Sequence, residues 1–157
     1  MNQRLRNVLL FFAMFLIPFA LWATDRQAGT WKMNMEKSKF ASDMPAPKGE
    51  TVVIEEQEGG LKVVSNGLNA AGTPTHFEYS VKYDGKDYPI TGSPAVDAVA
   101  IKKIDDSTIE TMRKKNGVVV TTNTTVISKD GKTRTNVFHG KNANGEPRTW
   151  TVIFDKQ

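Results

Sequence analysis

Turn-forming dipeptides recur at strand-length intervals along residues 29–157, and this spacing constrains the fold more than any other feature. Asp84-Gly85, Asn116-Gly117 and Asp130-Gly131 are typical of tight hairpin turns. The intervening segments are rich in Val, Ile, Thr and aromatic residues, and none has room for an ordinary helix. The sequence therefore predicts an all-β fold. The predicted strands are 29–35, 51–57, 61–66, 74–83, 86–91, 96–104, 107–115, 118–128, 132–140 and 147–155.

Most successive strands are joined by short connections, which favours an antiparallel up-and-down meander. We predict that the meander closes into a β-barrel of about eight to ten strands, with the first strand paired to the last. Residues 36–50 contain Pro45 and Pro47 and show no alternation. We expect them to form a long connection across one end of the barrel.

Alternation of apolar and polar residues predicts which side chains face the barrel interior. Residues 121–125 differ, because they are rich in Thr and poor in apolar side chains, and we expect one face of that strand to contact water. The three predicted interior sets are Phe77, Tyr79, Val81 and Tyr83; Trp31, Met33 and Met35; and Trp150, Val152 and Phe154.

Residues 1–23 have the three parts of a secretory signal peptide: the basic residues Arg4 and Arg6, an apolar run over 8–21, and Ala23. A retained membrane anchor is the alternative, but the run is interrupted by Pro18 and falls short of the roughly 20 apolar residues that a spanning helix needs. We expect cleavage after Ala23. The product, residues 24–157, would be one secreted or periplasmic domain without stable membrane insertion.

Composition excludes several classes of function. The chain has no Cys, so disulfides, thiolate metal sites and cysteine nucleophiles are excluded. Lys and Arg number 21 against 17 Asp and Glu; without Arg4 and Arg6 the balance is 19 against 17, too small an excess to indicate nucleic-acid binding. Neither His76 nor His139 has a second ligand at a metal-binding spacing. Gly-x-Ser-x-Gly and Ser-x-x-Lys are absent. We predict no metal, no cofactor and no enzymatic activity.

Gly29-Thr30-Trp31, at the start of the first predicted strand, resembles the Gly-x-Trp motif of the calycin superfamily, the lipocalins and their relatives. Longer runs are similar to a group of small secreted bacterial lipocalin-like proteins of unassigned function, and this resemblance covers nearly all of 24–157. The runs are 29–34, 37–40, 83–92 and 128–133.

The resemblance implies a lipocalin-like barrel in which Trp31 packs across the closed end beneath an arginine. Arg148 is the first candidate for that arginine, and Arg134 is the second.

Two functions fit such a barrel. A hollow interior would bind a small hydrophobic or amphipathic ligand without catalysis, and flat aromatic side chains would line the site. A filled interior would leave an interaction module that acts through its outer face, by way of a basic patch around 113–115 or the connection 36–50. The sequence identifies neither the ligand nor a protein partner. The predicted lining residues are Phe77, Tyr79, Tyr83, Phe138 and Trp150.

Overall fold

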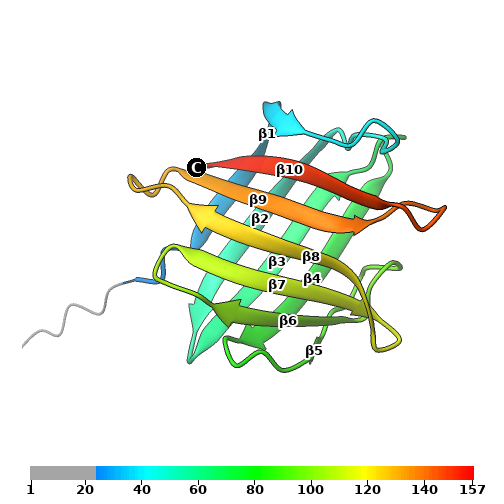
Figure 1. Ribbon diagram of the computed structural model, residues 1–157. Helices are drawn as coiled ribbons and strands as arrows, with labels where there is room; N and C mark the ends of the chain where they lie inside the picture. The colour runs from blue at the N-terminus through cyan, green and yellow to red at the C-terminus, as the bar shows by residue number, and fades with distance from the viewer. Residues whose placement is uncertain (1–23) are drawn as a thin grey trace, which may run out of the picture.

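The computed structural model describes residues 24–157, and the predicted signal peptide lies outside the described residues. Ten antiparallel strands form a single up-and-down sheet that curls into a nearly closed barrel (Figure 1). The described part of the chain has no helix, and so none able to cross a membrane. The all-β meander is confirmed, and each predicted strand is present. They are β1 (Gly29–Lys39), β2 (Gly49–Gln57), β3 (Gly60–Leu68), β4 (Pro74–Lys82), β5 (Tyr88–Pro89), β6 (Ala98–Lys103), β7 (Thr108–Lys115), β8 (Val118–Ile127), β9 (Thr133–Lys141) and β10 (Pro147–Lys156).

The two edges of the sheet lie in the middle of the chain, because the first and last strands pair with each other. The strand order is β4-β3-β2-β1-β10-β9-β8-β7-β6-β5, and Trp31 of β1 lies opposite Lys156 of β10. Edge strand β4 is joined to the other edge by reciprocal backbone hydrogen bonds between Glu78 and Thr91, each 3.0 Å long. We call this junction of β4 with the segment after β5 the seam. The barrel is therefore closed by a few bonds at the seam, whereas all other neighbouring strands except β5 and β6 share four or more residue pairs.

A bulge makes β1 longer than predicted. The register changes from Asn34 opposite Ile153 to Lys39 opposite Thr151, so β1 carries extra residues against β10. The bulge interrupts the alternation, and Met35, predicted to face the interior, is 38% exposed. The connection to β2 is consequently residues 40–48 and not 36–50.

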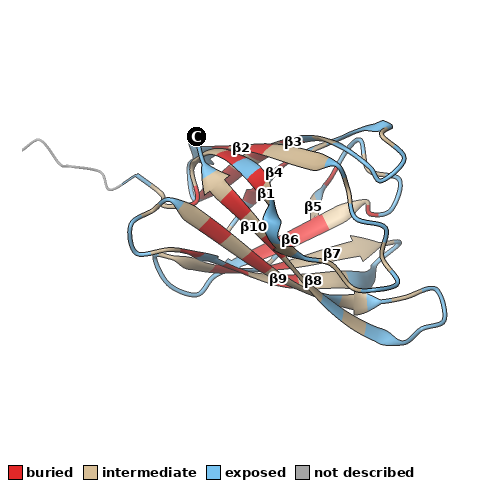
Figure 2. Ribbon diagram, turned by 90° about the horizontal axis from the view of Figure 1, so that it is seen from above, coloured by how far each residue is buried: buried red, intermediate tan, exposed pale blue. Residues whose placement is uncertain are grey.

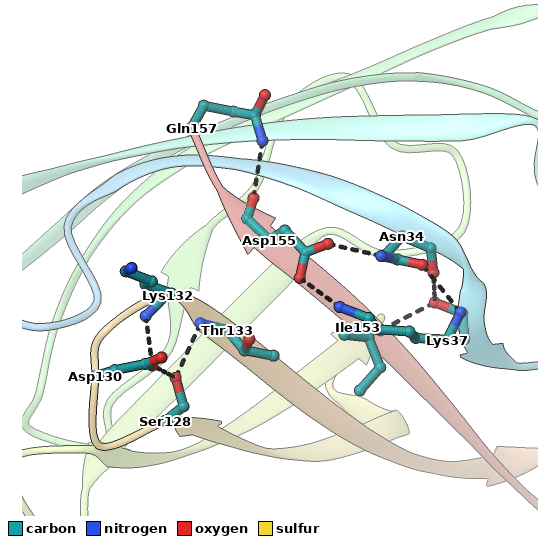
Figure 3. A network of polar contacts seen from close by, with 10 residues as sticks. Asn34, Lys37, Ser128, Asp130, Lys132, Thr133, Ile153, Asp155 and Gln157 are labelled. Atoms are coloured by element: carbon teal, nitrogen blue, oxygen red, sulfur yellow. Dashed lines mark hydrogen bonds and ion pairs between the residues drawn. The ribbon is translucent and has the colours of Figure 1, made fainter.

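Side chains reinforce the pairing of β1 with β10 at this bulge (Figure 3). The backbone N–H of Ile153 donates to Ser38 Oγ at 3.0 Å, which replaces a ladder bond that the bulge removes. The Asp155 carboxylate accepts hydrogen bonds from Asn34 Nδ2 at 2.6 Å and Lys37 Nζ at 3.3 Å. The hydrogen bond from Asn34 and the nearby Lys37 charge lower the pKa of Asp155.

The two Asp-Gly-Lys turns have the same local structure but different roles. In each, the aspartate Oδ1 accepts a hydrogen bond at 3.0 Å from the lysine N–H, and the glycine has a positive φ, 73° at Gly85 and 72° at Gly131. The turn at Asp130 closes the β8–β9 hairpin (Figure 3). The turn at Asp84 instead connects the two edges of the sheet, which the sequence does not distinguish from a hairpin.

One end of the barrel is filled with apolar side chains, and we call it the closed end. Trp31 has no exposed surface there, and its Nε1 donates to the Gln27 carbonyl at 2.9 Å. Residues 24–28 are fastened to this end, since Arg26 Nη2 donates to the Ser128 carbonyl at 2.6 Å. Figure 2 shows the buried positions within the strands and the exposed turns at their ends. The other fully enclosed side chains include Ile54, Leu61, Ile101, Ile109 and Ile127.

Arg148 does not cover Trp31, contrary to the expectation drawn from the resemblance. Arg148 lies at the other end of β10, about 26 Å along the strand from Lys156, and its guanidinium carbon is 5.4 Å from the centre of the Trp150 ring. Lys156 Nζ lies over Trp31 instead, at 5.1 Å. The antiparallel register of β1 and β10 dictates this outcome, because it brings the last residue of β10 against Trp31.

Candidate functional site

The inner face of β8 is polar and buried, and its other face is partly exposed, as expected for a strand with one face in contact with water. Asn123 and Thr125 point into the barrel and are at most 4% exposed. Valines occupy exposed positions of the same strand instead, with Val118 66% and Val126 42% exposed. β8 thus places polar side chains inside the barrel beside the buried Ile127, while several of its valines are exposed.

A chain of hydrogen bonds satisfies these buried polar groups. Arg113 Nη1 on β7 donates to Asn123 Oδ1 at 2.5 Å, and Asn123 Nδ2 donates to Thr125 Oγ1 at 3.0 Å. The Thr125 hydroxyl in turn donates to Asn136 Oδ1 on β9 at 2.6 Å. The chain crosses three adjacent strands and gives the barrel one polar inner wall, which we call the polar wall.

Arg134 lies beside the polar wall but does not join it. It shares the inner face of β9 with Asn136, two residues along, and is only 9% exposed. Its Nε is buried without a hydrogen-bond partner, and none of the ion pairs within residues 24–157 includes it. Burial lowers the pKa of Arg134, because the surroundings disfavour its charged form.

Two adjoining hollows occupy the half of the barrel opposite the closed end, and we call this half the open end. The inner hollow has about 40 Å³ and reaches Arg134, Asn136 and Tyr79. The outer hollow has about 280 Å³ and is walled by the segment after β5, including Ile90 and Val96, and by Trp150. Both hollows are lined by Glu50, Phe77, Arg113 and Phe138.

Stacked aromatic rings form the apolar surface of the open end. Phe138 and Trp150 are cross-strand partners on β9 and β10, with ring centres 5.1 Å apart and planes within 4° of parallel. Phe77 and Tyr79 on β4 stack similarly at 6.2 Å. The Arg113 guanidinium lies 5.5 Å from the Phe138 ring centre. The site thus presents flat apolar surfaces flanked by guanidinium groups.

Glu50 supplies the carboxylate of the site. It lies on β2, across the barrel from the polar wall, and its Oε1 accepts a hydrogen bond from Ser65 Oγ on β3 at 2.5 Å. Among the residues that line the two hollows, the charged ones are Arg113, Arg134 and Glu50.

The structure brings four of the five sequence-predicted lining residues to these hollows, namely Phe77, Tyr79, Phe138 and Trp150. Tyr83 is not among them. It lies at the closed end, where its hydroxyl donates to Asp25 Oδ2 at 2.8 Å. Burial, and then that hydrogen bond, raise the pKa of Tyr83 far above its ordinary value. Tyr83 shares the inward face of Tyr79, but it is four residues farther towards the closed end.

The polar members of the site are absent from the sequence-based prediction. Alternation could have identified Arg134 and Asn136, because they share a face with Phe138 on β9. It could also have identified Arg113, which shares a face with the enclosed Ile109. These residues were not predicted to line the site, because charged and amide side chains are usually expected on the outside of a barrel.

The basic patch expected around 113–115 is divided and largely paired. Arg113 points inward, whereas Lys114 Nζ lies 2.8 Å from Asp87 and Lys115 Nζ lies 3.8 Å from Asp97. No group of three or more His, Asp or Glu residues able to hold a metal ion occurs within 24–157.

A third hollow of about 520 Å³ lies over residues 118–122 and 139–141. Its apolar surface comes from Val118, Val119 and Val120, all of them exposed.

No protein-family model matches the sequence, and the search of curated proteins gives no significant match.

Proposed function

We propose that residues 24–157 form an exported, non-enzymatic binding protein that holds one small, partly apolar molecule in the open end of the barrel. The observation that carries this proposal is the pair of adjoining hollows lined by Phe77, Phe138 and Trp150. Concave sites with mostly apolar linings and a few convergent polar groups are the usual form of small-molecule sites.

The contrast with the closed end supports binding at the open end only. The closed end is filled, because Trp31 and Leu61 have no exposed surface there. At the open end Phe77, Phe138 and Trp150 are only partly buried, and the rings of Phe138 and Trp150 stack on each other. A ligand inserted between these rings and the segment 90–97 would bury apolar surface that is otherwise in contact with solvent.

The proposal includes export and a lipocalin-like relationship. The three-part segment at 1–23 supports export, and the barrel with its Gly29-x-Trp31 start is compatible with the relationship. Amino-terminal sequencing of the protein released by its own host tests the first part. We expect the released chain to begin at Thr24, and a chain that keeps residues 1–23 would contradict export with cleavage.

Native mass spectrometry of the protein purified from its own host, followed by solvent extraction, tests ligand binding. We expect one small molecule per chain. The matched variants are Trp150→Ala, at the outer hollow, and Trp31→Phe, at the closed end. The first should lose the bound mass and the second should keep it. The proposal would be contradicted if wild type and both variants showed only the mass of the polypeptide, even after incubation with a lipid and metabolite extract.

The exposed valines favour one alternative, an interaction module that uses its outer face. Val118, Val119 and Val120 form an apolar surface at the β7–β8 turn that nothing within residues 24–157 covers. Under this alternative Val119→Lys would abolish association with a protein partner, detected by cross-linking in host extracts, and would leave ligand content unchanged.

A further inference from the structure

We propose that the molecule held in the barrel is a small organic carboxylate, whose acid group pairs with the guanidinium of Arg134 while its flat apolar body lies against Phe138 and Trp150. This inference rests on the proposed function, since it concerns the same hollows. It specifies the chemical class of the ligand and the residue that selects it.

The buried charge of Arg134 has no partner within residues 24–157. A guanidinium keeps its proton at any physiological pH, so Arg134 is a cation that is nine-tenths buried. Its Nε has no acceptor, and no carboxylate within residues 24–157 lies within ion-pairing distance of it. Buried charges in proteins are nearly always paired, because an unpaired one is costly. An anion from outside the chain would remove that cost.

The acceptors of the polar wall beside Arg134 already take hydrogen bonds within that wall. Asn123 Oδ1, Thr125 Oγ1 and Asn136 Oδ1 each accept a hydrogen bond within the polar wall, and the donor at the start of that wall is another arginine, Arg113. The polar wall therefore does not neutralise Arg134. It fixes the surrounding side chains in one arrangement and leaves the guanidinium facing the inner hollow.

The side chains that line the two hollows carry a net positive charge. Their lining includes two guanidinium groups, Arg113 and Arg134, and one carboxylate, Glu50. One positive charge is left over, which matches a monoanion. A neutral ligand would leave that charge unbalanced, and a dianion would reverse it.

The two hollows also match such a ligand in size and shape. The inner hollow of about 40 Å³ has room for a head group of a few atoms, and the outer hollow of about 280 Å³ has room for a small body. A carboxylate is planar and matches a guanidinium through two parallel hydrogen bonds. The stacked rings of Phe138 and Trp150 favour a flat body.

The test compares each acid with its uncharged amide of the same shape. Calorimetric titration at pH 7 would use 2-naphthoate against 2-naphthamide, and octanoate against octanamide. We expect the better acid to bind at least about 30-fold more tightly than its amide, the ratio expected for a desolvated ion pair. Quenching of Trp150 emission should accompany binding, because Trp31 is enclosed at the closed end and serves as an internal reference.

Three variants assign the effect to one residue. Arg134→Met, which removes the guanidinium and keeps an unbranched apolar side chain, should abolish the preference for the acid. Arg134→Lys keeps the charge but not the paired geometry, so its preference should be intermediate. Arg26→Met is the matched control, because Arg26 is bound to backbone carbonyls at the closed end, and it should keep the full preference. Far-UV circular dichroism verifies that each variant folds.

The outcomes separate the two proposals. Equal affinity for acid and amide, unchanged by Arg134→Met, would overturn the carboxylate inference and leave the binding function standing. Absence of binding by all four probes, together with a bare mass from the host, would overturn both. A preference for the acid that survives Arg134→Met would show that another cation selects the ligand, and would also overturn the inference.

Discussion

The two ends of this barrel are built from the same strands but differ in how completely their side chains are buried and their charges paired. At the closed end, β-branched and aliphatic side chains surround Trp31 and exclude water, and residues 24–28 are fastened to the rim. At the open end, aromatic rings remain partly exposed and guanidinium groups lie among them. The closed end therefore carries the stability of the barrel. The open end leaves apolar surface exposed and one positive charge unbalanced. We expect a bound ligand to cover that surface and balance that charge, and so to stabilise the protein.

The largest expected effect comes from the same substitution at the two ends. Trp31→Ala should lower the free energy of unfolding by about 3–5 kcal/mol, because it leaves a cavity in a filled core. Trp150→Ala should lower it by only about 1 kcal/mol, since Trp150 is already partly exposed. Urea denaturation followed by far-UV circular dichroism measures both. Equal losses would show that the two ends contribute alike and would remove the contrast.

Arg134→Met should raise the free energy of unfolding of the ligand-free protein, by about 1–4 kcal/mol, because an apolar side chain replaces an unpaired buried charge. Thermal and urea denaturation of the protein, stripped of ligand, check the sign. Arg26→Met at the closed end should have the opposite sign, since it removes hydrogen bonds to Ser128 and Lys129 carbonyls. A loss of stability in Arg134→Met would mean that Arg134 serves the fold and not a ligand.

Thr125→Val should cost about 1–3 kcal/mol, because it leaves Asn123 Nδ2 and Asn136 Oδ1 buried without their shared partner. Thr121→Val, on the same strand at the outer hollow, is the matched control, with an expected change below about 0.5 kcal/mol. Denaturant unfolding measures both. If the two changes had equal effects, the polar wall would not act as a connected unit.

The smallest expected effect is a pH dependence at the β1–β10 pairing. The pKa of Asp155 is lower when folded than when unfolded, mainly because Asn34 donates to it. Asp155 therefore contributes stability above its unfolded pKa, and this contribution is lost as the pH falls through the folded value. Asp155→Asn should lower stability near neutral pH by well under about 1 kcal/mol. Its stability should then change less than that of wild type below about pH 4. Parallel curves for the two proteins would contradict the assignment.

Much of the fold could be predicted from the sequence because turn chemistry is local. Asp-Gly and Asn-Gly turns mark four of the nine strand connections, and alternation correctly assigns Trp31, Tyr79 and Phe154 to the interior. The bulge in β1 could not be predicted, because it depends on pairing with β10. Met35 is therefore exposed although it fits the alternation.

The candidate site was predictable only in its apolar half. Aromatic side chains on alternating strands suggest an interior lining, which is where Phe138 and Trp150 lie. The polar half depends on contacts among β7, β8 and β9, such as the hydrogen bond between Thr125 and Asn136. A buried arginine without a partner cannot be distinguished in the sequence from a surface arginine, because its isolation is a property of the surrounding strands.

The seam borders the entrance to the outer hollow. The segment that carries Ile90 and Val96 walls the outer hollow, and the same segment is held to β4 by the reciprocal hydrogen bonds between Glu78 and Thr91. The ladders that join β9 to β10, β2 to β3 and β3 to β4 have nine residue pairs each. We therefore expect the entrance to widen at the seam when a larger ligand binds, while Trp31 and its neighbours stay in place.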